Sequence, residues 1–397
     1  MEILALIVIV ILSFLLQSWI FEKYAFTKLH YTCEFSTETA VEGDNILLIE
    51  QVHNNKLLPL HWLKVEIYSS RWLDFAQTRS VVSQESRFVT SGFFLRSYQK
   101  TTRHWNVLCL KRGVYTIKSV TLVTGDLFGY STKSMPVPMN KTLIVYPKCV
   151  NLEALFIRPN DLTGDSIVKH WLIDDPFVIS GIREYHFGDP MNKIHWPSAA
   201  KYGKLMVRNN EYTNNRHTDI ILNIQSIPYE YREVVNKGIA ELGIKITATL
   251  FKKAAEANIP VRFLCNGSTV DHEEQLIFTN TSTGGIHTDS LFTLLAKLKL
   301  QKNMEFEDFI ESLMHRLDNK NIIIVTAYLT NRLCNILSAL KSKNISIEIL
   351  LLNSCIEPDI YLNGIHVHLL TTNIEEVLSK AEIKTLFGVD TLEKEKK

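Results

Sequence analysis

The sequence predicts a multidomain protein with an N-terminal transmembrane helix, a small β-sandwich domain and a C-terminal α/β domain. Three observations lead to this fold class. The chain begins with a long apolar run, continues with short alternating strand-like runs, and ends with strands that alternate with helical stretches. At 397 residues the chain is too long for one ordinary hydrophobic core, which favours two folded domains.

Composition excludes some functions. The chain has 43 Lys and Arg residues against 42 Asp and Glu residues, a formal net charge of +1, so charge gives no reason to expect nucleic acid as a partner. Six cysteines show no Cys-x-x-Cys pair and no zinc-ligand spacing, and they are too sparse for a disulfide framework. We therefore expect no bound cofactor and no structural zinc.

The apolar run extends from Ile3 to Phe21. As a helix it is roughly 28 Å long, enough to span the hydrocarbon core of a bilayer. A cleaved signal peptide normally has a basic leader and a small-residue cleavage site, and neither is visible here. Residues 1–24 are expected to be an uncleaved anchor. Lys23 and Lys28 follow the span and favour a body on the cytoplasmic side of the cell membrane.

Residues 29–147 are expected to form the β-sandwich domain. Short runs of alternating or β-branched residues are separated by turn formers, with no helical stretch of any length between them. The expected strands are 46–49, 63–68, 102–107, 114–117 and 120–123. Pro136, Pro138 and Pro147 are expected to mark the exit from the domain.

Residues 148–212 are expected to be an irregular connector, residues 213–390 an α/β domain, and residues 391–397 a charged tail. Strands alternating with helices indicate a mostly parallel sheet covered on both faces. The expected strands are 217–227, 261–265, 322–325, 347–352 and 365–370. The expected helices are 230–258, 291–300, 305–318, 332–343 and 374–386.

The connector contains a dense segment, Gly181–Pro190 continuing through Ile194–Lys201 to Gly203–Val207, with turn formers, both charge signs, two histidines and a tryptophan. This segment resembles the signature of the bacterial family called domain of unknown function 58. Residues 109–115, 125–129 and 143–147 are similar to features of that family's β domain. Many members have two membrane helices, whereas this sequence has one apolar span.

The resemblance implies an architecture and partners. It implies N-terminal membrane helices, a β domain, the signature connector, and a von Willebrand factor A-like domain of the doubly wound, Rossmann type. It also implies work beside a MoxR-type AAA+ ATPase, and often beside a transglutaminase-like membrane protein. Architecture alone does not transmit a function.

A von Willebrand factor A-like domain often binds magnesium through an Asp-x-Ser-x-Ser loop and a later aspartate. The matching positions here are Asn223, Gln225 and Ile227 in the first loop, and Ala327 in the later one. Hard cations need oxygen ligands that usually include a carboxylate. With both acidic positions replaced by neutral residues, the site is expected to be degenerate and to hold no metal.

The signature segment carries the candidate interaction residues. Two roles are open for them: hydrogen bonds, ion pairs and a buried Trp196 that hold the connector in shape, or a docking surface in which Tyr185 and Trp196 contact a partner. The set is Arg183, Glu184, Tyr185, Gly188, Asp189, His195, Trp196 and Lys204.

The sequence therefore predicts a membrane-anchored, non-enzymatic interaction or scaffold protein in contact with membrane lipid, and the family resemblance implies a MoxR-type ATPase and a transglutaminase-like membrane protein as its partners. One alternative is an outward-facing adhesion-type binding module. Another is a hydrolase that uses Glu184, Asp189 and His195, residue types that general acid–base catalysis employs. No serine or cysteine beside them forms a nucleophile-elbow pattern.

Overall fold

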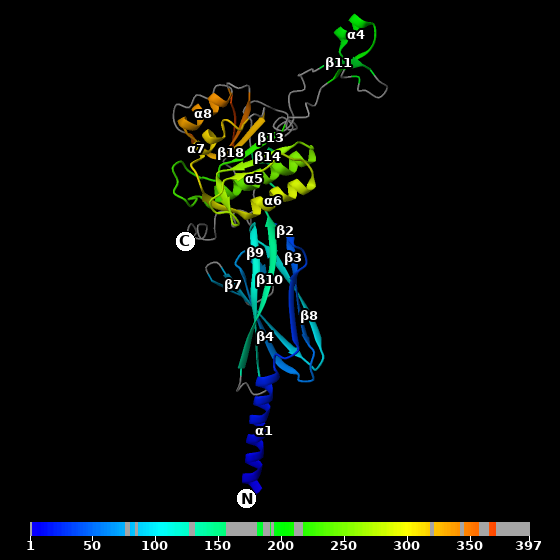
Figure 1. Ribbon diagram of the computed structural model, residues 1–397, viewed down its shortest axis with the longest axis vertical. Coiled ribbons are helices and arrows are strands. Elements are labelled where there is room, and N and C mark those ends of the chain that lie inside the picture. Colours follow the sequence, from blue (N-terminus) through cyan, green and yellow to red (C-terminus); the bar gives the residue numbers. More distant parts are fainter. Residues whose placement is uncertain are drawn as a thin grey trace, which may run out of the picture. The chain divides into compact units, whose positions relative to one another are not determined.

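The computed structural model describes residues 2–75, 80–83, 86–126, 132–155, 181–185, 191, 194–209, 217–317, 321–341, 345–356 and 365–370 (Figure 1). The chain divides into two compact units. The first comprises residues 1–148 together with 295–297, and the second comprises 149–294 and 298–397. The expected helix at 374–386 and the charged tail lie outside the described residues.

The first unit begins with helix α1, Glu2–Tyr24. Its stretch Leu6–Tyr24 has a mean hydropathy of 1.9 and is long and apolar enough to cross a membrane. Most of its described large apolar side chains are exposed, as expected for a helix whose apolar surface has no protein to cover it. The end of the helix differs, because Phe21 and Ala25 are buried in the core of the β domain.

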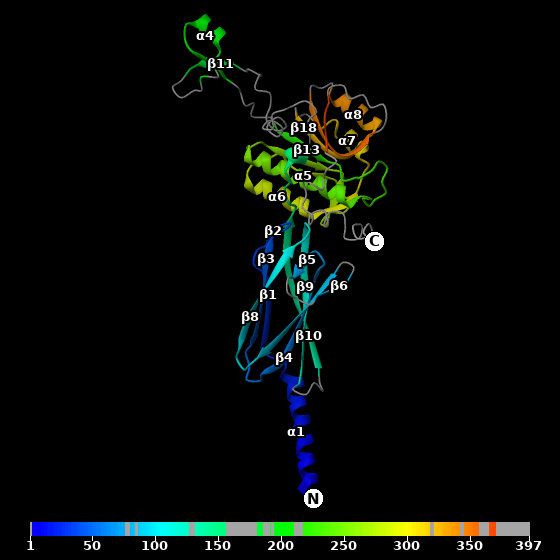
Figure 2. The same ribbon diagram turned by 180° about the vertical axis from the view of Figure 1, so that it is seen from behind.

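The β domain is a sandwich of two sheets (Figures 1 and 2). One sheet has the order β1-β3-β8-β5, with β1 Leu29–Phe35, β3 Asn45–Asn54, β8 Lys100–Cys109 and β5 Leu73–Phe75. The other has the order β2-β10-β9-β4-β7-β6, with β2 Thr39–Val41, β10 Thr132–Tyr146, β9 Gly113–Gly125, β4 Leu60–Ser70, β7 Ser86–Leu95 and β6 Ser80–Ser83. Alternate residues of the two sheets, among them Leu48, Val65 and Val107, form one hydrophobic core.

Two sequence predictions for this domain were wrong. Strand β9 is one continuous strand, not two, because it pairs with β10 along its whole length, with one irregularity in β10. Pro136 and Pro138 lie within β10 and do not end the domain. β10 pairs with β2 only at its last residues, so at both prolines it is an edge strand, where a missing N–H is tolerated.

Where the structure describes the signature segment, it has regular elements in place of the irregular connector predicted. Strands β11, Gly181–Glu184, and β12, Met206–Asn209, pair antiparallel, and the short helix α4, Trp196–Tyr202, lies between them in the chain. Proline follows Trp196 at the start of the helix, and Gly203 ends it in the left-handed conformation with φ 67°. Another short helix, α2 Leu152–Leu155, precedes this hairpin.

The second unit contains a six-stranded sheet of order β16-β14-β13-β18-β19-β20. Its strands are β16 Ile277–Phe278, β14 Val261–Cys265, β13 Thr218–Leu222, β18 Asn321–Leu329, β19 Ser346–Ile356 and β20 His366–Leu369. All neighbours pair in parallel except β16, which is antiparallel to β14. A separate pair is formed by β15, Gly267–Thr269, and β17, Leu298–Lys302.

Helices cover both faces of this sheet. On one face, Leu222, Val325 and Leu352 contact the middle of α5, Lys237–Glu256, at Gly243. On the other face, buried residues of β13, β18 and β19 pack with α7, Phe306–Leu313, and α8, Asn331–Lys341. A further helix, α6, spans Gly285–Lys297. The expected mostly parallel sheet with helices on both faces is therefore present.

Several predicted boundaries moved. The strand expected to run to residue 227 ends at Leu222, and the helix expected from residue 230 begins at Lys237 with Asn236 as its N-cap. Residues 223–236 between them form a loop. The helix expected at 291–300 ends at Lys297 and gives way to β17, while β18 continues to Leu329, past the predicted end at 325.

Candidate functional site

The candidate site lies at the carboxyl ends of β14, β13 and β18. The connection after β13 leads to α5 on one face of the sheet, and the connection after β18 leads to α8 on the other. Such a reversal leaves a crevice outside the carboxyl ends of the strands, which is where open α/β sheets bind ligands.

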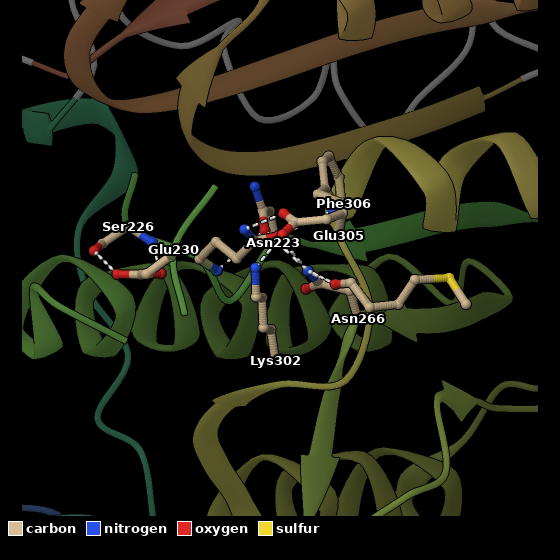
Figure 3. Close-up of polar contacts among 9 residues, drawn as sticks. Asn223, Ser226, Glu230, Asn266, Lys302, Glu305 and Phe306 are labelled. Atoms are coloured by element: carbon tan, nitrogen blue, oxygen red, sulfur yellow. Dashed lines mark hydrogen bonds and ion pairs between the residues drawn. The ribbon is translucent and has the colours of Figure 1, made fainter. Parts of the chain in front are cut away.

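Three amide side chains fill this edge (Figure 3). Asn223 follows β13 and donates from Nδ2 to Oγ1 of Thr326 in β18, 3.0 Å away. Its Oδ1 accepts from the Gln225 backbone N–H at 3.0 Å and from Nδ2 of Asn266, which follows β14, at 3.3 Å. Asn266 Oδ1 in turn accepts from the backbone N–H of Ile224 at 2.9 Å. All of these groups are buried.

Charged groups complete the network. Gln225 donates from Nε2 to Oε2 of Glu305 at 2.9 Å and accepts at Oε1 from the Phe306 backbone N–H at 2.9 Å. The second oxygen of Glu305 is ion-paired with Lys302. Close by in β18, burial and the carboxylate of Glu307 raise the pKa of the Tyr328 hydroxyl, which therefore stays protonated.

This donor set does not suit a hard cation. Asn223 and Gln225 each use both ends of the amide within the network, and the carboxylate of Glu305 is neutralised by Lys302. A divalent cation needs several free oxygens, usually with an uncompensated carboxylate. Ala327 is buried inside β18 and adds no ligand atom. No group of three or more His, Cys, Asp or Glu side chains in the described ranges is arranged to hold a metal ion.

Beside the network, Glu230 organises residues 226–236, which we call the aromatic loop (Figure 3). Its buried carboxylate accepts from the Ser226 backbone N–H at 3.0 Å, from Ser226 Oγ at 2.6 Å and from the Val235 backbone N–H. Ser226 Oγ accepts from the Asn236 backbone N–H at 2.9 Å, at the start of α5. A carboxylate near a helix N-terminus is favoured by the helix dipole, and these bonds offset its burial.

The aromatic loop is also tied to β17. Backbone bonds join Val234 to Leu300 at 3.2 Å and Lys302 to Arg232 at 3.0 Å. Held in this way, the loop exposes four large apolar side chains: Ile227, Tyr229, Tyr231 and Val235. Tyr231 is 92% exposed and Tyr229 75% exposed, and Tyr229 adopts a left-handed backbone with φ 55°, which is uncommon for a bulky residue.

Strands β11 and β12 with helix α4 between them, which we call the signature hairpin, bring together only some of the predicted interaction residues. Glu184 pairs with Lys204 at 2.8 Å, and both side chains are exposed. His195 is the N-cap of α4: its Nδ1 accepts from the Ser198 backbone N–H at 3.2 Å and lies 2.7 Å from Ser198 Oγ. Gly188 and Asp189 lie outside the described residues.

Trp196 contradicts the structural role predicted for it. The side chain is 64% exposed, so it does not supply the buried area that a packing role requires. Tyr202, Met191 and Leu205 of the same segment are exposed as well. The remaining predicted residues, Arg183 and Tyr185, are joined to the opposite chain of the hairpin by strand pairing with Val207 and by a backbone bond to Leu205.

Sequence reasoning missed the residues that dominate this site. Asn266 directly follows the predicted strand 261–265, so its position at the carboxyl edge of the sheet could have been predicted from the sequence. The predicted helix 230–258 included Glu230 and Tyr231, so the loop that these residues form was not predicted. The signal that argued against a helix there was Pro228 with the hydrogen-bonding Ser226, a typical loop combination.

No family model matches this sequence, and no curated protein matches it. Among solved structures, the chain is similar to a non-cellulosomal cohesin from the archaeon Archaeoglobus fulgidus, at 12% identity over 29% of this chain and 90% of that one, with a TM-score of 0.20. A cohesin module of a Clostridium perfringens family 33 glycoside hydrolase matches at 8% identity over 31% and 99%, with a TM-score of 0.22. A CARDB domain from Pyrococcus furiosus matches at 11% identity over 30% and 96%, with a TM-score of 0.20. Scores this low carry no conclusion about function.

Proposed function

We propose that this chain is a membrane-anchored, non-enzymatic interaction protein whose α/β domain binds a partner protein through the aromatic loop. The observation that carries the proposal is the exposure of Tyr229 and Tyr231 on a loop that the buried Glu230 holds in one conformation. Tyrosine and arginine dominate the binding energy of protein interfaces, and Arg232 is exposed beside the two tyrosines.

Two features favour a protein partner over a small ligand or a metal ion. The carboxyl edge of the sheet is occupied by amide side chains that satisfy one another, so a ligand must first break Asn223 and Gln225 away from their partners. The aromatic loop projects outward and is already ordered, which lowers the entropy lost on association with a large surface.

The family resemblance suggests the partner. In the proposed arrangement the α/β domain is von Willebrand factor A-like, and it engages a MoxR-type AAA+ ATPase. The β domain serves a membrane neighbour such as a transglutaminase-like protein. Because such an ATPase needs cytosolic ATP, the body lies on the cytoplasmic side, in keeping with Lys23 and Lys28 after the span. The exposed Trp196 of the signature hairpin supports a second docking surface.

Co-purification tests this function. Full-length protein, recovered from crosslinked membranes supplied with ATP, is expected to bring down an AAA+ ATPase, and the Tyr231→Ala variant is expected to bring down at least ten-fold less. Tyr68→Ala is the matched control, because Tyr68 is an exposed tyrosine of the β domain. Equal recovery with all three proteins, or no ATPase with any, contradicts the proposal.

Protease treatment of intact cells tests the side of the membrane. Protection of the body supports the cytoplasmic arrangement. Digestion places the body outside, separates it from ATP, and favours the outward-facing binding module instead.

A further inference from the structure

The end of α1 is built into the β domain. Phe21 and Ala25 are buried in the domain's core, and the ammonium of Lys56 donates to the backbone carbonyls of Ala25 and Thr27, the latter at 3.1 Å. Lys133 of β10 donates to the carbonyl of Glu22 at 2.8 Å. Lys133 satisfies a carbonyl that the end of the helix leaves free, and Lys56 satisfies carbonyls of the turn that follows the helix. The positive charge of both lysines suits a helix C-terminus. The helix therefore has no free linker to the domain.

Three loops lie beside this helix end, and they form the base of the domain, the end from which α1 emerges (Figure 1). They are residues 25–28, 55–59 and 96–99, and we call them the base loops. Backbone bonds join Asn55 to Lys28 at 3.0 Å and Tyr98 to Lys56 at 3.2 Å. The side-chain amide of Asn54 donates to the carbonyls of Leu58 at 3.0 Å and Arg96 at 2.9 Å. The three loops thus form one continuous surface.

This surface exposes large apolar side chains to solvent, which is energetically unfavourable. Leu57 is 75% exposed and Tyr98 is 63% exposed, and Phe94 at the end of β7 is exposed as well. Both Lys28 and Tyr98 have left-handed backbones, with φ 50° and 55°. Bulky residues rarely adopt this conformation, and where they do so the cause is often functional.

The charge of the base is one-sided. Lys23, Lys28, Arg96, Lys100 and Lys133 lie in residues 19–28, 96–100 and 132–133, at the end of α1, in the base loops and at the strand ends beside them. Glu22 is the one acid in these stretches and in the base loop 55–59. The whole chain has a net charge of only +1, so the excess is local. Basic groups at this position relative to an apolar helix attract anionic lipid headgroups.

The last turns of α1 carry residues that are typical of the boundary between membrane and water. Trp19 and Tyr24 are exposed, and the ammonium of Lys23 lies over both rings, 5.1 Å and 5.5 Å from their centroids. Tryptophan and tyrosine are enriched where a membrane helix leaves the hydrocarbon core. The water–lipid boundary therefore falls at the last turns of α1, and the base loops begin directly after that helix.

We infer that the base of the β domain is a second membrane contact, in which Leu57 and Tyr98 enter the headgroup region and Lys28, Arg96 and Lys100 bind anionic phospholipid. This inference rests on the proposed anchoring of α1 in the membrane. Because Phe21 and Ala25 fix the end of α1 to the domain core, this contact holds the domain at a fixed height and orientation on the bilayer.

Spin labels on the full-length protein in nanodiscs test this contact. Single cysteines replace Leu57, Tyr98, Tyr68 and Leu12 in a background with Cys149→Ser and Cys355→Ser, since the other four cysteines are buried. Collision rates with oxygen and with a water-soluble nickel complex then report the depth of each label. Labels at 57 and 98 are expected to be at least five-fold less accessible to nickel than the label at 68.

The label at 12 separates the two claims. If it reports the bilayer core while labels 57 and 98 are as accessible as label 68, the anchor stands and the second contact is wrong. If label 12 is itself accessible to nickel, the anchor fails and the second contact fails with it.

Lipid charge tests the basic residues. Lys28→Gln, Arg96→Gln and Lys100→Gln together are expected to abolish the added protection of label 98 that phosphatidylglycerol gives over phosphatidylcholine alone. Lys118→Gln, on exposed β9 away from the base, is the matched control. No difference between the two lipid compositions in the unsubstituted protein contradicts the assignment of these cations.

Discussion

The base of the β domain and the aromatic loop of the α/β domain are each ordered by one buried charged side chain, and the two charges are of opposite sign. At the base, the buried Lys56 donates to backbone carbonyls of the turn that follows α1, and Leu57 and Tyr98 are exposed in the base loops. In the α/β domain, the buried Glu230 accepts from backbone N–H groups just before a helix. In both, a charge satisfied by backbone groups orders a loop that exposes apolar side chains.

The difference between these two regions indicates different partners. The base continues from an apolar helix and carries a one-sided positive charge, a combination that suits lipid. Among the described residues no apolar helix of this kind adjoins the aromatic loop, which lies instead beside a closed network of amides and one ion pair. Exposed tyrosines on an ordered loop suit a protein surface. The predictions below test how far each buried charge supports its loop.

The largest expected effect is that of Glu230→Ala. Removing the carboxylate leaves the N–H groups of Ser226 and Val235 and the hydroxyl of Ser226 without their acceptor, so we expect a loss of about 3–5 kcal/mol in the free energy of unfolding of the α/β domain, at about 1–3 kcal/mol for each unsatisfied donor. Hydrogen exchange in residues 226–236 and denaturant unfolding of the full chain in detergent measure it. A loss below about 1 kcal/mol contradicts the role given to Glu230.

Glu50 of the β domain comes next, because it lies between the two sheets and accepts hydrogen bonds from Tyr31, Ser91 and Trp105 at 3.0–3.1 Å. Glu50→Ala is expected to cost about 2–4 kcal/mol of stability, since three donors lose their acceptor. Glu50→Gln keeps one acceptor oxygen and is expected to cost less than half as much. Equal losses from the two variants contradict this account.

The pH dependence of the same variants has a defined sign. Burial raises the pKa of Glu50 above its ordinary value, so its contribution to stability is full below pH 4.5 and falls as the pH rises through the folded-state pKa. Glu50→Gln is expected to remove this fall. Unfolding curves of both proteins between pH 4 and 8 measure it, and parallel curves count against it.

A smaller effect is expected at Lys56. Burial lowers its pKa to about 8, so the domain gains stability as the pH rises from 8 to 10.5, where the unfolded chain also loses its proton. The gain is roughly 1–2 kcal/mol after allowance for water at the ammonium. Lys56→Met is expected to remove this gain and to open the chain between Tyr24 and Leu29 to protease. An unchanged cleavage rate contradicts the capping role.

The smallest effect on stability is expected at Tyr231. With its side chain almost fully exposed, Tyr231→Ala is expected to change the free energy of unfolding by no more than about 0.5 kcal/mol. Any loss of partner binding in this variant is then due to the missing contact between the Tyr231 side chain and the partner, and not to unfolding. A destabilisation beyond about 1 kcal/mol shows that the ring is packed, and contradicts its assignment as a free docking group.

The sequence predicted the buried helices and strands of this protein better than the strands at the edges of its sheets. Apolar periodicity identified α1, β14 and α8 because burial on one side or on all sides leaves a pattern in the chain. It failed at β10, where two prolines are tolerated only because β2 is too short to pair with that part of the strand. That condition depends on tertiary structure and has no local signal.

The candidate site shows the same limit. Asn223 and Gln225 were identified through a family resemblance, but their partners Asn266, Lys302 and Glu305 come from other elements whose meeting depends on the strand order. The aromatic loop was hidden because Val234 and Val235 fit a helical spacing. The hydrogen bonds of one buried glutamate outweigh that weak preference.

Site-specific photocrosslinking tests the central claim most directly. A photoreactive amino acid at Tyr231 of the full-length protein, activated in native membranes with ATP present, is expected to form a covalent product with an AAA+ ATPase. The same group at Tyr68 is expected to form none. Products from both positions, or from neither, contradict the proposal that the aromatic loop is the protein's docking surface.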